Sequence, residues 1–385
     1  MSRSLARTWL LAGALAGSLG FSCTNEEPFP NFDEIELLRS LHSPPSTPPR
    51  DPTNRYGDLP AAAALGDRLF KDPALSGCGR VSCQSCHGGP GRASDTALPE
   101  GCGGLASRHP PTVLNVGYST WFMWDGRADR LWNQALLPLL NPVEMASSPE
   151  RLRARLAEAY APEYKALFGK EPAEETDDAQ LLAHFGKVIA AYERTLNRNN
   201  SAFDRDVVRF LAAVDAGTEQ QDPAYLGLKT FVRKAQCSAC HKGPMLSDDQ
   251  FHNIGVKDAT AGRRGVAEAA DAMLQWTFNS AGPYSDAPVG TESVRLQRLS
   301  SDLREKAGEL EGAFKTPTLR NVELTAPYMH TGAYATLEDV VELYDKGGEP
   351  AGTHAGQVSV TIRKLELTDA EKKSLVTLLK SMTGQ

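Results

Sequence analysis

Two short cysteine motifs have the residue types and spacing that point most directly to chemistry. Each places two cysteines three positions apart, followed at once by a histidine: Cys83, Cys86 and His87 in the first copy, and Cys237, Cys240 and His241 in the second. Thiols one helical turn apart can bond both vinyl groups of one porphyrin, while the adjacent histidine ligates its iron. The motifs therefore predict two covalently attached c-type haems.

Zinc binding and dithiol redox chemistry are the competing interpretations of these cysteines. A structural zinc site normally has four closing ligands, and a thioredoxin-type dithiol does not require a histidine after the second cysteine. Because the histidine occurs in both copies, the haem interpretation is favoured.

Three of the seven cysteines lie outside these motifs. Cys78 and Cys102 flank the first motif, and a leftover pair in an exported protein can oxidise, so we expect a disulfide between them. Cys23 follows an apolar stretch over residues 9–19. It either becomes lipidated at a lipoprotein cleavage site or follows an ordinary signal cleavage.

Length and composition indicate an exported globular protein. The 385 residues are 41% hydrophobic and carry a net charge of −7, without the basic runs that would favour nucleic acid as a partner. Residues 1–22 resemble a signal peptide, and the prolines of residues 23–54 favour an extended tether. We therefore expect a periplasmic or otherwise exported protein that reaches a membrane only through a lipid on Cys23.

Hydrophobic periodicity predicts helices and no series of strands. Apolar residues recur at helical spacing in residues 181–196 and 375–382, and residues 61–70 suggest a shorter helix. Thr368 and Glu371 form a capping box that opens the last helix. The polar segment 256–314 is expected to form loops, with one helix within residues 292–309.

The fold class that follows is all-α, with two tandem c-type cytochrome domains that each wrap one haem. The first domain is expected to span residues 55–220 and the second residues 221–385.

The sixth coordination position of each haem iron decides the chemistry, because an electron carrier fills it with a protein ligand and a peroxidase leaves it open. Between His87 and Thr112 the only histidine is His109, before two prolines, and there is no methionine. The first iron is therefore expected to be open and peroxidatic.

Several further motifs resemble those of the bacterial dihaem cytochrome c peroxidases, the superfamily that includes the MauG proteins. The resemblance covers about residues 55–385 and rests on segments Leu65–Phe70, Pro111–Asn115, Trp124–Arg127, Asn141–Met145, Phe251–Gly255, Lys315–Asn321, Ala326–Gly332 and Tyr344–Gly348. It implies that Glu144 and Gln134 lie on the distal side of the first haem. There a carboxylate can move protons while peroxide is cleaved, and the amide can bind peroxide or orient the carboxylate. It also implies that Trp124 lies between the haems as an electron relay.

Tyr344 separates two groups within this superfamily. It occupies the position where the peroxidases have a ligating methionine, and in this it resembles MauG, so the resemblance implies that His241 and Tyr344 ligate the second iron. Spacing alone also allows Tyr344 to be a core aromatic of a helix over residues 337–344, in which case Met329, Met273 or Met245 would be the substitute ligand.

The resemblance also implies a calcium ion between the domains. Thr325 and Pro327 match two of its positions, but His109 stands where the family has an asparagine, and imidazole is a poor ligand for calcium. Calcium binding is therefore left open.

Together these features predict a dihaem c-type peroxidase of MauG-like character that reduces hydrogen peroxide. Electrons would come from a small redox protein or from a protein substrate. A conventional cytochrome c peroxidase with a methionine-ligated second haem, and a non-catalytic dihaem electron carrier, remain the alternatives.

Overall fold

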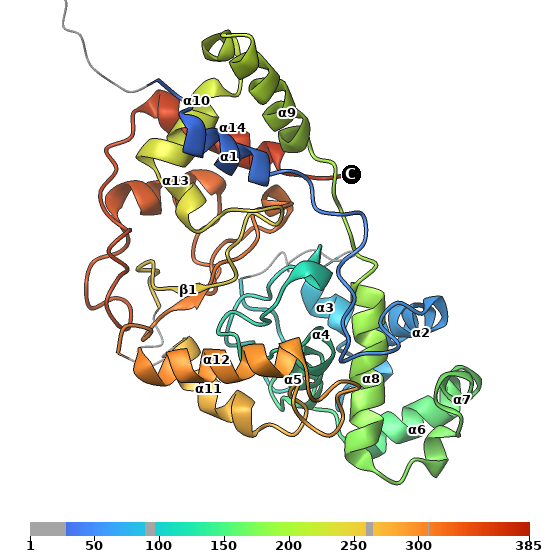
Figure 1. The fold of residues 1–385 in the computed structure, drawn as a ribbon. Coiled ribbons are helices and arrows are strands. Elements are labelled where there is room, and N and C mark those ends of the chain that lie inside the picture. The colour runs from blue at the N-terminus through green and yellow to red at the C-terminus, as the bar shows by residue number, and fades with distance from the viewer. Residues whose placement is uncertain (1–27, 89–96, 259–264, 307) are drawn as a thin grey trace, which may run out of the picture.

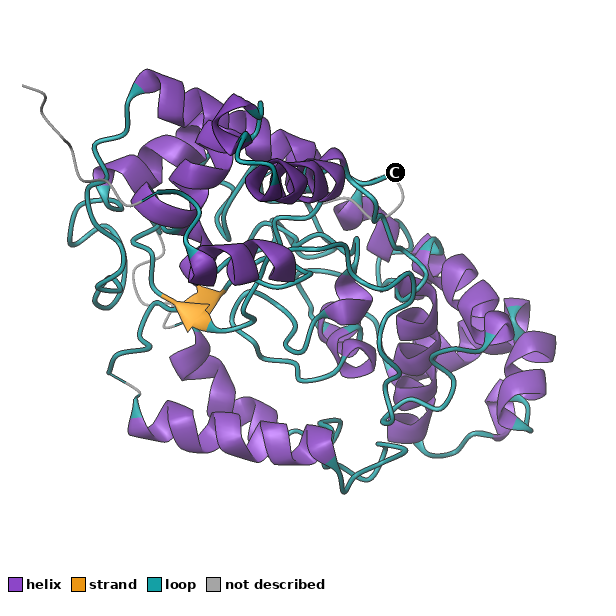
Figure 2. Cartoon of the chain, turned by 45° about the horizontal axis from the view of Figure 1, so that its top comes forward, coloured by secondary structure: helices purple, strands orange, loops and turns teal. Residues whose placement is uncertain are grey.

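The computed structural model describes residues 28–88, 97–258, 265–306 and 308–385. Helices form the outside of the molecule and loops fill much of its middle (Figure 2). Helices α2–α8 gather in one part, and α1, α9, α10, α13 and α14 in another (Figure 1). The bounds of the first group are α2 (Pro60–Phe70), α3 (Cys83–His87), α4 (Leu131–Gln134), α5 (Leu136–Leu140), α6 (Pro149–Ala159), α7 (Ala161–Phe168) and α8 (Asp178–Glu193). The bounds of the second are α1 (Phe32–Ser40), α9 (Ala202–Asp215), α10 (Tyr225–Lys229), α13 (Leu337–Lys346) and α14 (Asp369–Ser381).

The predicted mostly helical fold is confirmed. In the described ranges, regular strands are limited to β1 (Phe251–His252) and β2 (Phe314–Lys315), which pair antiparallel. The helices predicted over residues 61–70, 181–196 and 375–382 correspond to α2, α8 and α14. The expected capping box is present at α14, where Glu371 and Thr368 exchange backbone-to-side-chain hydrogen bonds.

The first hydrophobic core is built around α8. The Asp177 carboxylate caps this helix by accepting from the backbone of Ala179 and Gln180, and nearly every residue from Leu181 onward is buried. Helix α2 crosses α8 at Gly66, where a Cβ atom would lie 2.0 Å from the Val188 carbonyl oxygen. Only glycine permits this approach. The contact fixes the position of α2, the α-helix that precedes the first haem motif in sequence, against α8.

The second hydrophobic core contains part of the segment expected to be a tether. In α1, Asn31 accepts from the Glu34 backbone, Leu38 is fully buried, and Arg233 donates to Glu34 at 2.6 Å. The tether prediction is therefore wrong for residues 28–42. The prolines lie mainly beyond residue 43, and the apolar residues before them pack on the second core. Residues 1–22 and Cys23 lie outside the described ranges.

The division between the two cores also differs from the predicted boundary. Phe203, Val207 and Phe210 of α9 are buried in the second core, whereas the first core ends in sequence with α8, apart from Phe278. The two halves therefore separate between α8 and α9, and not near residue 220. Turn-forming residues at 216–224 only join α9 to α10.

The segment between β1 and β2 follows the second cysteine motif in sequence but packs against the first half of the chain. It contains α12 (Thr291–Glu305), as expected, and α11 (Val266–Gln275), which the sequence analysis missed. Phe278 enters the first core, and the buried Lys187 ammonium donates to Asp286 at 2.8 Å. Arg130 and Glu292 form a second ion pair at 2.7 Å. Among the described helices, none is both long and apolar enough to cross a bilayer.

Candidate functional site

The first cysteine motif forms the short helix α3. The imidazole Nδ1 of His87 donates to the carbonyl oxygen of Pro111 at 3.1 Å, which leaves Nε2 for a metal. Burial lowers the pKa of His87 to about 4, so the ring is neutral near pH 7, as a metal ligand must be.

The second motif repeats this arrangement on a short 3-10 turn, η6 (Cys237–Ala239). The Nδ1 of His241 donates to the carbonyl oxygen of Leu246 at 2.9 Å, and burial lowers the pKa of its ring. The cysteines of both motifs are free thiols, as covalent haem attachment requires.

Two adjoining cavities meet beside these motifs. The first is lined by Cys83, Cys86 and Glu144, and the second by His241 and Tyr344, while His87, Met123, Trp124 and Gln134 line both. The buried carbonyl oxygen of Gln134 accepts no hydrogen bond from any residue the structure describes. Since buried polar atoms are rarely left unpaired, a ligand in the cavity is expected. Two thiols with a histidine whose Nε2 is available fit a c-type haem.

A carboxyl group and an amide, those of Glu144 and Gln134, line the first cavity, and their place on the distal side of a haem stays a prediction. The Asn141 amide donates to the Glu144 carboxyl at 2.7 Å. Burial raises the pKa of Glu144, while Arg127 and the Asn141 hydrogen bond partly offset that rise. Gln134 is buried at the end of α4, and its amide nitrogen lies 3.9 Å from the Met123 sulfur.

Two methionines at this cavity were not considered as sixth ligands in the sequence analysis, although Met145 belongs to one of the recognised motifs. Met123 and Met145 both line it, although the sequence search for a sixth ligand stopped at Thr112. Met145 is buried in the first core, whereas the Met123 side chain is only partly buried. Met123 is the residue before Trp124, so extending the search to that motif would have found it.

The predicted Cys78–Cys102 disulfide is present, with its Cα atoms 5.6 Å apart. It also holds the chain around Glu144. The Cys102 backbone donates to the Glu144 carbonyl at 2.7 Å, and the Gly77 backbone donates to the Met145 carbonyl at 2.7 Å. The bond therefore fixes two loops against the segment that presents the carboxyl group.

Trp124 lies where the two halves of the chain meet. Its indole donates to the His109 carbonyl at 2.7 Å, and its own carbonyl accepts from the Lys315 backbone at 2.7 Å. The His109 backbone in turn donates to the His330 carbonyl at 2.8 Å. Because Trp124 lines both cavities, its position suits contact with two haems.

Tyr344 faces the second cavity from α13. Leu337, Val341 and Tyr344 of this helix all line the cavity, but Leu337 and Val341 are buried while Tyr344 is only partly buried. Burial raises the pKa of its phenol, with a smaller contribution from the nearby Cys237 and Cys240 thiols. The phenol therefore lies close to the second haem motif.

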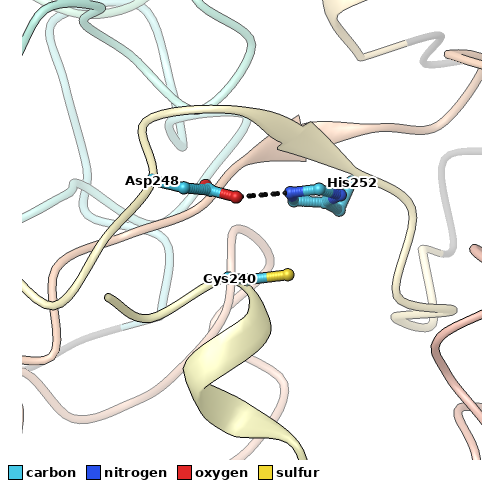
Figure 3. A group of neighbouring side chains, drawn as sticks. All are labelled: Cys240, Asp248 and His252. Carbon is cyan, nitrogen blue, oxygen red and sulfur yellow. Dashed lines mark hydrogen bonds and ion pairs between the residues drawn. The ribbon is translucent and has the colours of Figure 1, made fainter. Parts of the chain in front are cut away.

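A cluster of Cys240, Asp248 and His252 surrounds the second attachment point (Figure 3). The His252 Nε2 lies 3.0 Å from an Asp248 oxygen, and this hydrogen bond, together with the Cys240 thiol, raises the His252 pKa to about 10. Cys240 belongs to the haem motif, so the cluster borders that site and is no separate metal centre.

The two residues matched to a calcium position, Thr325 and Pro327, line the second cavity. The Thr325 hydroxyl donates to the Val322 carbonyl at 2.8 Å. His109, which stands at the third position, uses its Nδ1 to donate to the Ala97 carbonyl at 3.1 Å. Calcium binding stays a prediction.

Comparisons with known proteins agree with this geometry. A family model described as "Di-haem cytochrome c peroxidase" matches residues 60–209. The methylamine utilization protein MauG of Methylorubrum extorquens is 32% identical over 91% of this chain and 86% of its own length. The cytochrome-c peroxidase IdrP2 of Denitromonas iodatirespirans is also 32% identical, over 83% of this chain and 81% of its own.

A solved structure has a similar fold. It is the crystal structure of a MauG-like protein associated with microbial copper homeostasis, with a TM-score of 0.63 and 28% sequence identity. The match covers 89% of this chain and 94% of the other.

Proposed function

The chain belongs to the di-haem cytochrome c peroxidase family, and on that premise we propose that it is a dihaem c-type peroxidase of MauG-like character. Hydrogen peroxide is reduced in the cavity between His87 and Glu144, and the oxidising equivalents are shared with the site of His241 and Tyr344. When attached, the two haems would supply the iron that binds peroxide and the redox centres that hold the oxidising equivalents. The observation that carries the proposal is the cavity lining, in which the partly buried Glu144 and the buried Gln134 occur together with His87.

Glu144 is the group that moves protons in this proposal. Heterolytic O–O cleavage needs a base that takes a proton from the near oxygen and returns it to the leaving one. Burial raises the pKa of the Glu144 carboxyl toward the working pH, which suits both steps. Asn141 holds the carboxyl in place, and the unpaired Gln134 oxygen can accept a hydrogen bond from peroxide.

Trp124 and Tyr344 distribute the oxidising equivalents. The indole of Trp124 is fixed by the His109 carbonyl and borders both cavities, so it provides a short path between them. A tyrosinate from Tyr344 is a hard anionic donor that favours oxidised iron. The position of its phenol beside Cys237 and Cys240 supports this ligation.

The partners and location follow from the same reaction. Electrons come from a small redox protein or from a protein substrate oxidised at a distance. The signal-like residues 1–22 support export to the periplasm or outside the cell, with Cys23 either lipidated or left near an ordinary cleavage site. Calcium at Thr325 and Pro327 is left open, because His109 stands at the third position and imidazole is a poor ligand for this cation.

A second candidate function is electron transfer without catalysis, which Met123 favours. Its sulfur borders the first cavity, and a thioether bound to the first iron would close the peroxide position. A third candidate is a conventional peroxidase in which Met329 ligates the second iron. Met329 lines the second cavity, whereas Met245 and Met273 do not.

Mixing the as-isolated diferric holoprotein with one equivalent of hydrogen peroxide in a stopped-flow spectrometer tests these functions. The MauG-like proposal predicts a rapid spectral change at both haems without prior reduction. A reaction only after one-electron reduction would indicate the conventional peroxidase. No reaction in either state would overturn the peroxidase proposal and leave the electron carrier.

A further inference from the structure

Glu193, the last residue of α8, is a buried carboxyl group that the proposed peroxidase reaction does not use. Its side chain is 3% exposed and lines the cavity of the first haem motif. Its Oε2 atom has no hydrogen-bond partner among the residues that the structure describes. Burial alone raises the pKa of Glu193 to about 8.

The surroundings of Glu193 contain no charge that compensates an ionised carboxylate. Phe70 of α2 and Ile189, one turn earlier on α8, are its apolar neighbours in the cavity wall. The Cys83 thiol of α3 lies within electrostatic reach, since Glu193 contributes to the raised pKa of that thiol. The other ionisable groups of the lining, none of which shifts the Glu193 pKa, are Cys86, His87, Arg108, His109, Arg127 and Glu144.

We propose that Glu193 is the redox-linked proton site of the first haem, protonated when that haem is reduced and ionised when it is oxidised. Cys83 would be an attachment point of the haem and lies within electrostatic reach of Glu193, so a bound haem would adjoin this carboxyl group. When one electron leaves the haem, one proton leaves the Glu193 carboxyl for solvent, and the net charge of the cavity is unchanged. Reduction returns one electron and one proton.

The physical cause is the low dielectric of the cavity. A buried carboxylate without a partner is costly, but an added positive charge nearby offsets that cost. Oxidation of the iron adds that charge, so it favours loss of the proton. This inference goes beyond the proposed function, because it requires only haem attachment at Cys83 and no reaction with peroxide.

Spectroelectrochemical titration of the holoprotein at a series of pH values tests the coupling. At a fixed potential, the ratio of reduced to oxidised first haem is expected to fall by up to about tenfold per pH unit where Glu193 titrates. The isosteric variant Glu193→Gln is expected to lose this dependence. Glu175→Gln is the matched control, since Glu175 is also buried but pairs with Lys170 at 2.6 Å away from this cavity, and it is expected to retain the dependence.

Redox-difference infrared spectroscopy provides a second readout that does not depend on activity. A protonated-carboxyl C=O band is expected to appear on reduction in the wild type and in Glu175→Gln, and to be missing in Glu193→Gln. The same pH dependence in Glu193→Gln as in the wild type would overturn the proposal. If the variant does not fold, absence of any such band in the wild type would also overturn it.

Discussion

The two haem motifs are alike on the histidine side and differ on the side that would face the sixth iron position. His87 and His241 are each oriented by a backbone carbonyl that accepts from Nδ1. Besides the histidine, the first cavity is lined by Glu144 and Gln134, whereas Tyr344 lines only the second. The orientation of the histidine is therefore the same at both motifs, and in our proposal the two haem sites differ in role because other side chains line the two cavities.

Replacing Tyr344 by methionine is expected to have the largest effect on this difference. Exchange of an anionic oxygen donor for a neutral thioether should raise the potential of the second haem by on the order of hundreds of millivolts. A redox titration of Tyr344→Met measures it. Tyr334→Phe is the control, because its hydroxyl donates to Glu349 at 2.9 Å outside the cavity lining. Equal potentials in Tyr344→Met and wild type would show that Tyr344 is a core aromatic.

Glu144→Gln should give the next largest effect, confined to the first cavity. Loss of the proton-transfer group is expected to slow peroxide cleavage by about 10²–10⁴-fold while both haems are still incorporated. Stopped-flow kinetics and the pyridine haemochrome spectrum measure the two quantities. Glu158→Gln, an exposed carboxylate paired with Arg155, serves as the control. Unchanged kinetics in Glu144→Gln would remove the assigned role.

Removal of the disulfide should reduce stability by a smaller amount. The bond joins residues 24 positions apart, so the double variant Cys78→Ser/Cys102→Ser is expected to lose roughly 3 kcal/mol of unfolding free energy. Urea unfolding of the holoprotein measures this loss. Peroxide cleavage should also slow, because the Cys102 backbone no longer holds the Glu144 segment firmly. Wild-type stability and kinetics in the double variant would show that the loops are held without the bond.

The smallest predicted effect concerns the pH dependence of the first cavity. Glu144 must be ionised to accept a proton, and burial raises its pKa, so the rate should fall with decreasing pH through a pKa above that of an ordinary carboxyl group. Arg127 lowers that pKa. Arg127→Gln should therefore move the acid limb of the pH–rate profile for peroxide cleavage to higher pH. At a pH on that limb, the rate of peroxide cleavage should fall by about two- to fivefold. A limb that moves to lower pH would contradict the assignment.

The sequence predicted the attachment sites better than the environment around them. The Cys-x-x-Cys-His motif lies within five consecutive residues, so it can be read without knowing the fold. The periodicity of α8 and the pairing of Cys78 with Cys102 also follow from residue types and spacing alone. Met123 and Glu193 were missed, because their place in the cavity depends on how α8 and the loop before Trp124 pack around α3. The packing of the segment around Asp286 against α8 was missed for the same reason. It depends on contacts between residues about 100 positions apart, such as Lys187 and Asp286.

Electron paramagnetic resonance of the as-isolated ferric holoprotein tests directly whether the sixth coordination position of the first iron is free of a protein ligand. We expect a high-spin signal from the haem at His87 and a low-spin signal from the haem at His241. The high-spin signal should be unchanged in Met123→Leu. Two low-spin signals in the wild type, one of which becomes high-spin in Met123→Leu, would show that this methionine closes the peroxide position and would contradict the account.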